Sequence, residues 1–204
     1  MSITKRKKET LKLILDSIEE NGYPPTLSEL RGSLRVNSNQ AVLDHLVFLE
    51  REGYIKREGT ARGIKVLEKS YELLETDSHL IPVLGSTSAG SPVSSEQYLE
   101  DWVKVSTEVS KPKNDIFLIK VHGDSMIGAG IYDGDLVMIQ PTSEAKNNDI
   151  ILAYMNGETT VKRLVKKLGK NYLRPENPKY KDIKLAGVND FQIQGKVVGV
   201  IRSI

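Results

Sequence analysis

A serine and a lysine, Ser125 and Lys162, are the residues whose types and surroundings best suit covalent chemistry in this 204-residue chain. Ser125 lies in the motif Gly-Asp-Ser-Met at residues 123–126, directly after an apolar run at residues 116–121 that predicts a strand. A serine hydroxyl is a weak nucleophile and needs a base. Lys162 can act as that base if burial removes its proton, because desolvation disfavours the ammonium form.

The same residues also have common structural roles. A serine after Gly-Asp usually belongs to a turn, and the Lys-Arg pair at residues 162–163 would usually lie on a solvated strand edge. His122 precedes the motif and fits a surface or packing residue better than a base. His45 falls in a predicted helix and His79 in a predicted linker, so neither is an obvious partner for the serine. Residue types and spacing alone therefore favour the structural roles over catalysis.

Composition excludes several other kinds of chemistry. The chain has no cysteine, which excludes disulfides, iron–sulfur clusters and thiol nucleophiles, and its three histidines are a poor ligand set for structural zinc. We therefore expect no metal and no organic cofactor. No apolar run approaches the roughly 20 residues that span a bilayer, and the N-terminus lacks the apolar stretch of a secretory signal. We expect a cytoplasmic protein that binds no membrane.

The N-terminal third has the pattern of three short helices followed by a hairpin. Apolar residues recur at helical spacing in three segments: Leu11, Ile14, Leu15 and Ile18; Leu27, Leu30 and Leu34; Val42, Leu46 and Leu49. Thr26 and Glu29 have the spacing of a capping box at the second helix, and Ser38 can cap the third. Two β-prone runs at residues 54–57 and 63–67 flank a turn. This order predicts a winged helix-turn-helix.

The start of the predicted third helix carries side chains that can read base edges in double-stranded DNA. Asparagine and glutamine can bond adenine, aspartate can accept from cytosine, and small or apolar side chains can touch a thymine methyl group. The candidate base-reading residues are Ser38, Asn39, Gln40, Ala41, Leu43 and Asp44. The candidate backbone contacts are residues 5–8, Arg31, Arg35, Lys56, Arg57 and Arg62. Caps, solvated surface or a protein-interaction module would explain each feature singly, but their combination favours DNA binding.

The charge balance and the pattern of apolar runs divide the chain in two. Residues 1–69 carry 13 basic and 10 acidic side chains, whereas residues 70–204 carry 16 and 17. From residue 80 onward, turn residues separate short apolar runs at 116–121, 136–139, 150–154, 159–165, 172–173 and 197–201. We predict an α+β protein of two domains: a winged helix-turn-helix over residues 1–69, a charged linker over 70–79 and a mostly β domain over 80–204.

Both halves resemble the LexA-type repressors of the bacterial SOS response, which are self-cleaving Ser-Lys peptidases of family S24. The resemblance covers nearly the whole chain. The matching segments are residues 22–26, 89–90, 123–126, 130–135, 160–164, 174–177 and 195–202. Ser125 precedes Lys162 by 37 residues, and the Ala89–Gly90 pair lies about 35 residues before Ser125. This order and spacing make the resemblance specific.

The resemblance implies a self-cleaving repressor whose second domain has the LexA and signal-peptidase fold. In that reading Ser125 attacks the peptide bond between Ala89 and Gly90, and a neutral Lys162 removes the hydroxyl proton. Backbone amides near Ser125 and Met126 would form the oxyanion hole. Val83 and Leu84 would help dock the cleavage segment.

The resemblance also implies the partners: double-stranded operator DNA, a second copy of the chain in a homodimer, and the RecA filament on single-stranded DNA that stimulates cleavage. No cofactor is implied, and the protein would be nucleoid-associated. The chain departs from the family's pattern at Leu43, where well-known members have a polar base reader, and at Arg31, which is unusual in the second helix. No operator sequence is therefore carried over.

Alternatives with related architecture stay open at this stage. A prophage repressor would share the chemistry but control other genes, and a non-enzymatic dimeric regulator would use its β domain for a ligand or for dimerisation alone. An accessory polymerase subunit or a signal peptidase could share the β fold. The DNA-binding pattern argues against the former and the missing membrane anchor against the latter.

Overall fold

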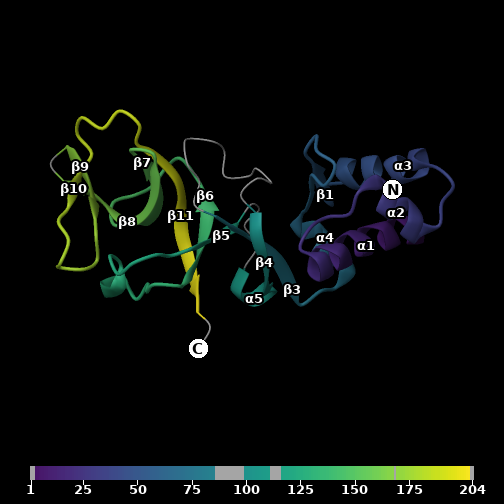
Figure 1. Ribbon diagram of the computed structural model, residues 1–204, viewed down its shortest axis with the longest axis horizontal. Coiled ribbons are helices and arrows are strands. Elements are labelled where there is room, and N and C mark those ends of the chain that lie inside the picture. Colours follow the sequence, from purple (N-terminus) through teal and green to yellow (C-terminus); the bar gives the residue numbers. More distant parts are fainter. Residues whose placement is uncertain (1–2, 86–98, 111–115, 168, 203–204) are drawn as a thin grey trace. The chain divides into compact units, whose positions relative to one another are not determined.

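The computed structural model describes residues 3–85, 99–110, 116–167 and 169–202. These residues form two compact units, Met1–Ile81 with Trp102–Asn114 and Pro82–Asp101 with Asp115–Ile204. The first unit contains most of the helices, whereas the second consists mainly of strands (Figure 1). The α+β fold class predicted from the sequence is confirmed.

The first unit contains the three helices and the hairpin that the sequence predicts. They are α1 (Lys5–Asn21), α2 (Leu27–Leu34), α3 (Asn39–Arg51), β1 (Ile55–Arg57) and β2 (Ile64–Val66), followed by α4 (Glu68–Leu74) and, further along the chain, α5 (Thr107–Ser110). Thr26 and Glu29 close the predicted capping box at α2. The Ser38 hydroxyl accepts the amide of Ala41 at the start of α3. The predicted winged helix-turn-helix is therefore present.

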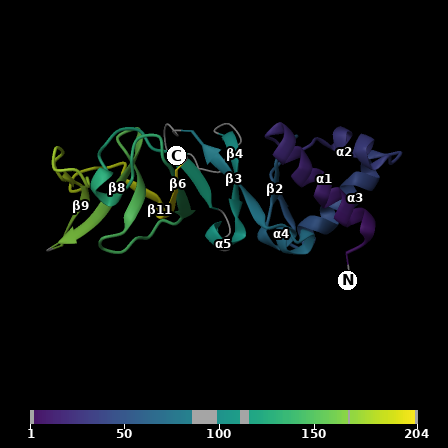
Figure 2. The same ribbon diagram turned by 90° about the horizontal axis from the view of Figure 1, so that it is seen from below.

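One apolar core joins α1, α2 and α3, which lie against one another in both views (Figures 1 and 2). Its most deeply buried side chains come from all three helices: Leu11, Ile14, Ile18, Leu30, Leu34, Val42, Leu46 and Leu49. They are the residues that the helical spacing of the sequence places on one face. This core fixes α3 with its N-terminal residues exposed.

The segment predicted as a linker is not structureless. Helix α4 covers its first part and strand β3 begins at Ser78. Tyr71 is 7% exposed, and burial raises the pKa of its hydroxyl to about 12. The neighbouring Leu73 and Leu74 pack against the helical core. A short helix with few apolar residues leaves little periodicity to detect, which is why the sequence pattern missed it.

The second unit is built on a nine-stranded sheet with the strand order β10-β9-β8-β7-β11-β6-β5-β3-β4. The strands are β3 (Ser78–Leu84), β4 (Leu99–Ser106), β5 (Phe117–Lys120), β6 (Leu136–Pro141), β7 (Ile150–Met155), β8 (Glu158–Lys167), β9 (Lys170–Arg174), β10 (Ile183–Lys184) and β11 (Gln192–Ile201). The six predicted runs are strands. Strands β3, β4 and β10 lie outside the predicted runs. Pro82 interrupts β3, and β10 is very short.

Strands β5 to β8 and β11 carry the apolar core of this unit. The buried side chains include Phe117, Ile119, Val137, Ile139, Leu152 and Val161. Strand β11 lies between β6 and β7 and pairs antiparallel with both, as the long yellow strand in Figure 1 illustrates. Within the described part of the chain, no helix has the length and apolar character needed to cross a membrane.

Candidate active site and DNA-binding surface

The serine lies in a loop between β5 and β6 that is fixed on both sides; we call residues 122–128 the serine loop. Gly123 has a φ of 86°, a conformation that favours glycine, and its amide donates to the Asp133 carboxylate over 2.7 Å. Met126 is 1% exposed and anchors the loop in the core. A short 3-10 helix, Ile127–Ala129, follows. Ser125 therefore lies between two anchored residues of its loop, Gly123 and Met126.

The lysine lies in the middle of β8, between β7 and β9. Its backbone is opposite Ile151 in the antiparallel pair with β7. The Lys162 Nζ lies 2.9 Å from the Ser125 hydroxyl oxygen, 2.7 Å from the Thr160 hydroxyl oxygen and 2.9 Å from the Val161 carbonyl oxygen. The structure therefore brings together two side chains that are 37 residues apart in the sequence.

Burial disfavours the charged form of this lysine. Lys162 is only 9% exposed, and burial lowers the pKa of its amine below that of an ordinary lysine. Among the described residues, no carboxylate forms an ion pair with it to offset this effect. A lysine in its neutral form, which burial favours, can take the proton of a serine hydroxyl that it contacts.

A cavity of about 180 Å³ opens beside the two side chains. It is lined by Leu84, Gly85, Glu100, Ile119, Lys120, Val121, His122, Ser125, Met126, Leu152, Thr159, Thr160, Val161 and Lys162. Leu84, which was expected to help dock a cleavage segment, is part of this lining. Val83 is buried and pairs with Leu118 of β5. Ala89 and Gly90 lie outside the described residues.

The histidines do not compete with the lysine for the role of base. His122 lines the cavity, but within the described part of the chain it forms no hydrogen bond with the serine. His45 pairs with Thr10 and His79 with Ser110, each through its Nδ1 at 2.9 Å. Neither of these two side chains lines the cavity.

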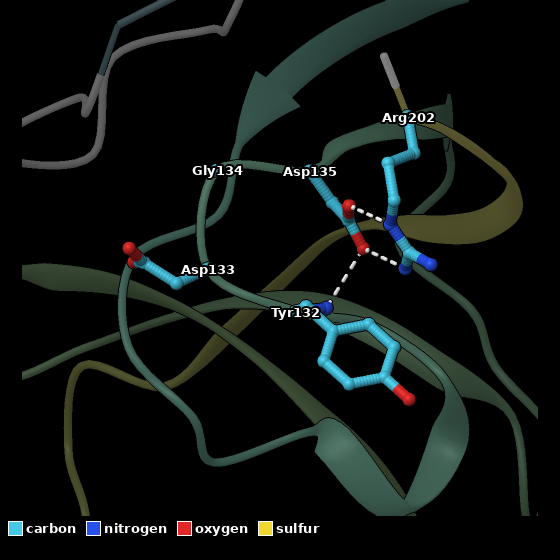
Figure 3. Close-up of a pocket in the computed structure, with 5 residues that line it drawn as sticks. All are labelled: Tyr132, Asp133, Gly134, Asp135 and Arg202. Atoms are coloured by element: carbon cyan, nitrogen blue, oxygen red, sulfur yellow. Dashed lines mark hydrogen bonds and ion pairs between the residues drawn. The ribbon is translucent and has the colours of Figure 1, made fainter. Parts of the chain in front are cut away.

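A second, open cavity of about 440 Å³ lies at the turn before β6 (Figure 3). Its Asp135 is 2% exposed and accepts two hydrogen bonds of 2.7 Å from the Arg202 guanidinium and one of 2.7 Å from the Tyr132 amide. The guanidinium, followed by that amide, holds the pKa of the carboxyl below its usual range despite burial. The same turn carries Asp133, whose carboxylate accepts the Gly123 amide of the serine loop.

The start of α3 presents the predicted base-reading residues to solvent. Ser38, Asn39, Gln40 and Asp44 are exposed, whereas Ala41 and Leu43 are half-buried. The Gln40 amide nitrogen donates to the Asp44 carboxylate over 2.9 Å, which holds both side chains in one arrangement. These residues are available for contact with a groove.

The predicted backbone contacts fall into two groups. Arg31, Arg35 and Lys56 are exposed. Arg57 and Arg62 are half-buried: the former is paired with Glu50 at 2.8 Å and the latter with Glu29 at 2.9 Å. The two pairs attach the β1–β2 hairpin to α3 and to the start of α2.

Sequence reasoning did not assign a role to Thr160, although its position was informative. It lies two residues before Lys162 in a strand, so both side chains share a face. The structure places its hydroxyl against the lysine amine. The described residues contain no cluster of three side chains suited to a metal ion.

Comparison with known proteins accounts for both units. Residues 1–63 match the LexA DNA binding domain, and residues 82–198 match the Peptidase S24-like family. A LexA repressor from Syntrophomonas wolfei is 37% identical over 205 residues, covering 100% of this chain and 98% of the other. One from Lactobacillus johnsonii is 38% identical and covers 96% and 94%.

A third relative, LexA repressor 1 from Geobacter sulfurreducens, is 38% identical and covers 98% of this chain and 96% of its own length. These matches span both units in the same order and confirm the family resemblance inferred from the sequence. The chain therefore belongs to the LexA repressor family, with a LexA DNA-binding domain followed by a peptidase S24-like domain.

Proposed function

We propose that this protein is a sequence-specific transcriptional repressor of DNA-damage genes that inactivates itself by cutting its own Ala89–Gly90 bond. Ser125 is the nucleophile and Lys162 the general base of this reaction. The observation that carries the proposal is the 2.9 Å contact between a serine hydroxyl and a buried lysine amine beside a cavity. Membership of the LexA repressor family supports binding to operator DNA and a peptidase activity directed at the chain itself.

The proposed chemistry begins when Lys162 takes the hydroxyl proton as the Ser125 oxygen attacks the carbonyl carbon of Ala89. The carbonyl oxygen becomes an oxyanion, which the amides near Ser125 and Met126 would stabilise. Collapse of this intermediate breaks the peptide bond, and the protonated lysine returns a proton to the amine of Gly90. Water then hydrolyses the acyl ester at Ala89 and regenerates Ser125.

The positions of Gly85 and Glu100 support cleavage within the same molecule. Gly85 precedes the segment of residues 86–98 and Glu100 lies just after it, and both line the cavity beside Ser125. Residues that flank Ala89 and Gly90 on both sides in the sequence therefore line the proposed site. A bond delivered by the same chain reacts at a high effective concentration.

The DNA-binding part of the proposal places α3 in the major groove of operator DNA. Its exposed polar start and the exposed cations Arg31, Arg35 and Lys56 support base reading and phosphate contact respectively. A homodimer would present two such helices to two half-sites. The RecA filament on single-stranded DNA would stimulate cleavage, as the family resemblance implies.

An incubation of the purified chain tests the peptidase. At alkaline pH, and separately with RecA filaments on single-stranded DNA, cleavage after Ala89 should give fragments of 89 and 115 residues by mass spectrometry. Ser125→Ala and Lys162→Ala should abolish the fragments. Ser143→Ala and Lys167→Ala change exposed residues and should leave the rate unchanged. A chain that stays intact under both conditions would be a non-enzymatic regulator and would refute the proposed dyad.

Operator binding tests the other half. Gln40→Ala and Asp44→Ala should weaken binding to the specific operator by roughly tenfold each and leave non-specific binding nearly unchanged. The two variants also break the Gln40–Asp44 hydrogen bond, so their effects should be less than additive in the double variant. Unchanged operator affinity in both would mean that another face reads the DNA.

A further inference from the structure

We propose that residues 176–180, the segment between β9 and β10, form a clamp. The clamp holds the serine loop in a fixed position against β8, the strand that carries Lys162. Asn177 and Tyr180 are its positioning residues, and both act on Ser125 through the neighbouring Asp124. This inference rests on the proposed Ser-Lys cleavage and adds the residues that set its geometry.

The clamp holds Asp124 by both its backbone and its side chain. The Asn177 amide nitrogen donates to the Asp124 carbonyl oxygen over 2.9 Å and to its carboxylate over 3.1 Å. The Tyr180 hydroxyl donates to the other carboxylate oxygen over 2.5 Å, and the Lys179 amine lies 3.7 Å from the carboxylate. The residue directly before Ser125 is therefore fixed at both ends.

Burial fixes the orientation of the Asn177 side chain in this clamp. Asn177 is 3% exposed, yet its side-chain oxygen accepts the Lys179 amide over 3.0 Å while its nitrogen serves Asp124. A buried amide side chain with every polar atom engaged has one stable orientation, because any other would leave polar atoms unsatisfied. Asn177 therefore holds Asp124, and with it the serine loop, in one position.

The same segment is attached to the strand that carries the base. Glu176 forms an ion pair with Arg163 over 2.5 Å, and Arg163 follows Lys162 in β8. The Arg163 guanidinium also donates to the Asn148 carbonyl oxygen over 2.6 Å. One short segment thus contacts the neighbour of the nucleophile and the neighbour of the base.

A third contact closes the clamp beyond the serine. The amide of Gly128 donates to the Glu176 carbonyl oxygen over 2.6 Å. A Cβ atom at Gly128 would lie 2.4 Å from that oxygen, so only glycine permits this approach. The serine loop is therefore bound to residues 176–180 on both sides of Ser125.

The test compares self-cleavage rates of the full-length chain at a temperature well below unfolding. Tyr180→Phe removes one hydroxyl from a side chain that is 49% exposed and should slow cleavage about threefold without lowering the melting temperature. Asn177→Ala should slow it about tenfold or more. Tyr23→Phe, at 43% exposure in the helical unit, is the matched control and should cleave at the wild-type rate. The midpoint of the pH–rate profile should stay in place, because neither clamp residue contacts Lys162.

A double-mutant cycle with Asp124→Ala separates positioning from general stabilisation. If Tyr180 acts through Asp124, Tyr180→Phe should have no further effect in the Asp124→Ala background. Wild-type rates in both clamp variants, or additive losses in the cycle, would overturn the clamp while leaving the peptidase intact. Failure of the wild-type chain to cleave, or cleavage by Ser125→Ala, would instead overturn the proposed function and the clamp with it.

Discussion

The surroundings of the Lys162 amine determine where its lone pair points. A neutral amine has two N–H groups and one lone pair, and three oxygen atoms lie within 2.9 Å of this nitrogen. The Val161 carbonyl oxygen can only accept, and the Thr160 hydroxyl is free to accept as well. When these two take both N–H groups, the lone pair is left facing the hydroxyl proton of Ser125. Thr160 therefore orients the proposed base.

Thr160→Val tests this orientation by replacing the hydroxyl with a methyl group. Self-cleavage should slow by about tenfold at the high-pH plateau, because the base is no longer oriented. The wild-type rate should rise with pH as Lys162 loses its proton, with a midpoint below the roughly 10.4 of an ordinary lysine. In Thr160→Val that midpoint should move lower still, since a hydrogen bond that favours the ammonium form has been removed.

Thr160→Ser is the control for this prediction because it keeps the hydroxyl. It should retain a rate and a midpoint close to those of the wild type. A Thr160→Val rate equal to that of Thr160→Ser would show that Val161 alone orients the amine.

At the scale of secondary-structure elements, the sequence predicts best what depends on near neighbours. The capping box of Thr26 and Glu29 and the cap at Ser38 are visible as residue types at fixed spacing, and both are formed. The burial of Lys162 is different, because it depends on β7, β9 and a loop that is distant in sequence. Residue types single out Lys162 as the best candidate base, but only the family resemblance points to its burial, since a Lys-Arg pair in a strand usually lies on a solvated edge.

The hairpin shows the same limit. Arg62 looks like a free cation in the sequence, but it binds Glu29 and the Pro24 carbonyl oxygen and lies 4.0 Å above the Tyr23 ring. The Glu29 carboxylate therefore serves both the capping box and the hairpin. Both the Thr26 amide and Arg62 hold the pKa of this carboxyl below its usual range.

Glu29→Gln separates a structural role of Arg62 from a direct contact with a phosphate. Glutamine preserves the capping box but removes the charge that holds Arg62. If Arg62 holds the hairpin in place, operator affinity should fall about threefold, within the usual range for an exposed ion pair. If Arg62 binds phosphate instead, its release should raise the affinity.

The control is Glu58→Gln, which removes the same charge from the hairpin turn without touching Arg62. Operator titrations at several salt concentrations should accompany it, because each lost phosphate contact lowers the salt slope by about 0.9. An affinity of Glu29→Gln equal to or above that of Glu58→Gln would contradict the structural role.

Arg202, which directly follows β11, pairs with Asp135 of the turn before β6 (Figure 3). Because Arg202 lowers the pKa of the buried Asp135, the pair stabilises the fold above the ordinary aspartate pKa of about 3.9. That contribution is lost as the pH falls through the lowered value in the folded state. Arg202→Gln should therefore reduce the melting temperature by about 5 °C at neutral pH.

The difference between wild type and Arg202→Gln should shrink as the pH falls below about 4, where this aspartate begins to bind a proton in the unfolded chain but not yet in the folded wild type. Arg174→Gln is the matched control, since its pair with Asp182 is exposed on both sides and should contribute little at any pH. A difference for Arg202→Gln that is independent of pH would mean that the side chain acts through packing alone.

At the scale of the whole molecule, the proposed cut does not fall at a boundary between the two units. Ala89 and Gly90 lie between β3 and β4 in the sequence, and β3 lies between β5 and β4 in the sheet. Cleavage would therefore leave β3 on the N-terminal fragment while both of its partner strands belong to the other. The parallel pairing of β3 with β5 joins Val83 to Leu118 and Leu84 to Ile119, so it is short.

Operator binding should consequently be lost in a step that follows scission. Before the cut, the proposed homodimer would hold two DNA-binding units at high effective concentration, and their separation should lower operator affinity by roughly 10²–10⁴-fold. That loss requires β3 to leave the sheet, so operator occupancy measured by fluorescence anisotropy should lag behind the fragment yield measured in the same samples. Ser125→Ala, treated identically, should stay bound throughout. Occupancy that falls in step with scission would show that pairing of β3 does not retain the N-terminal fragment.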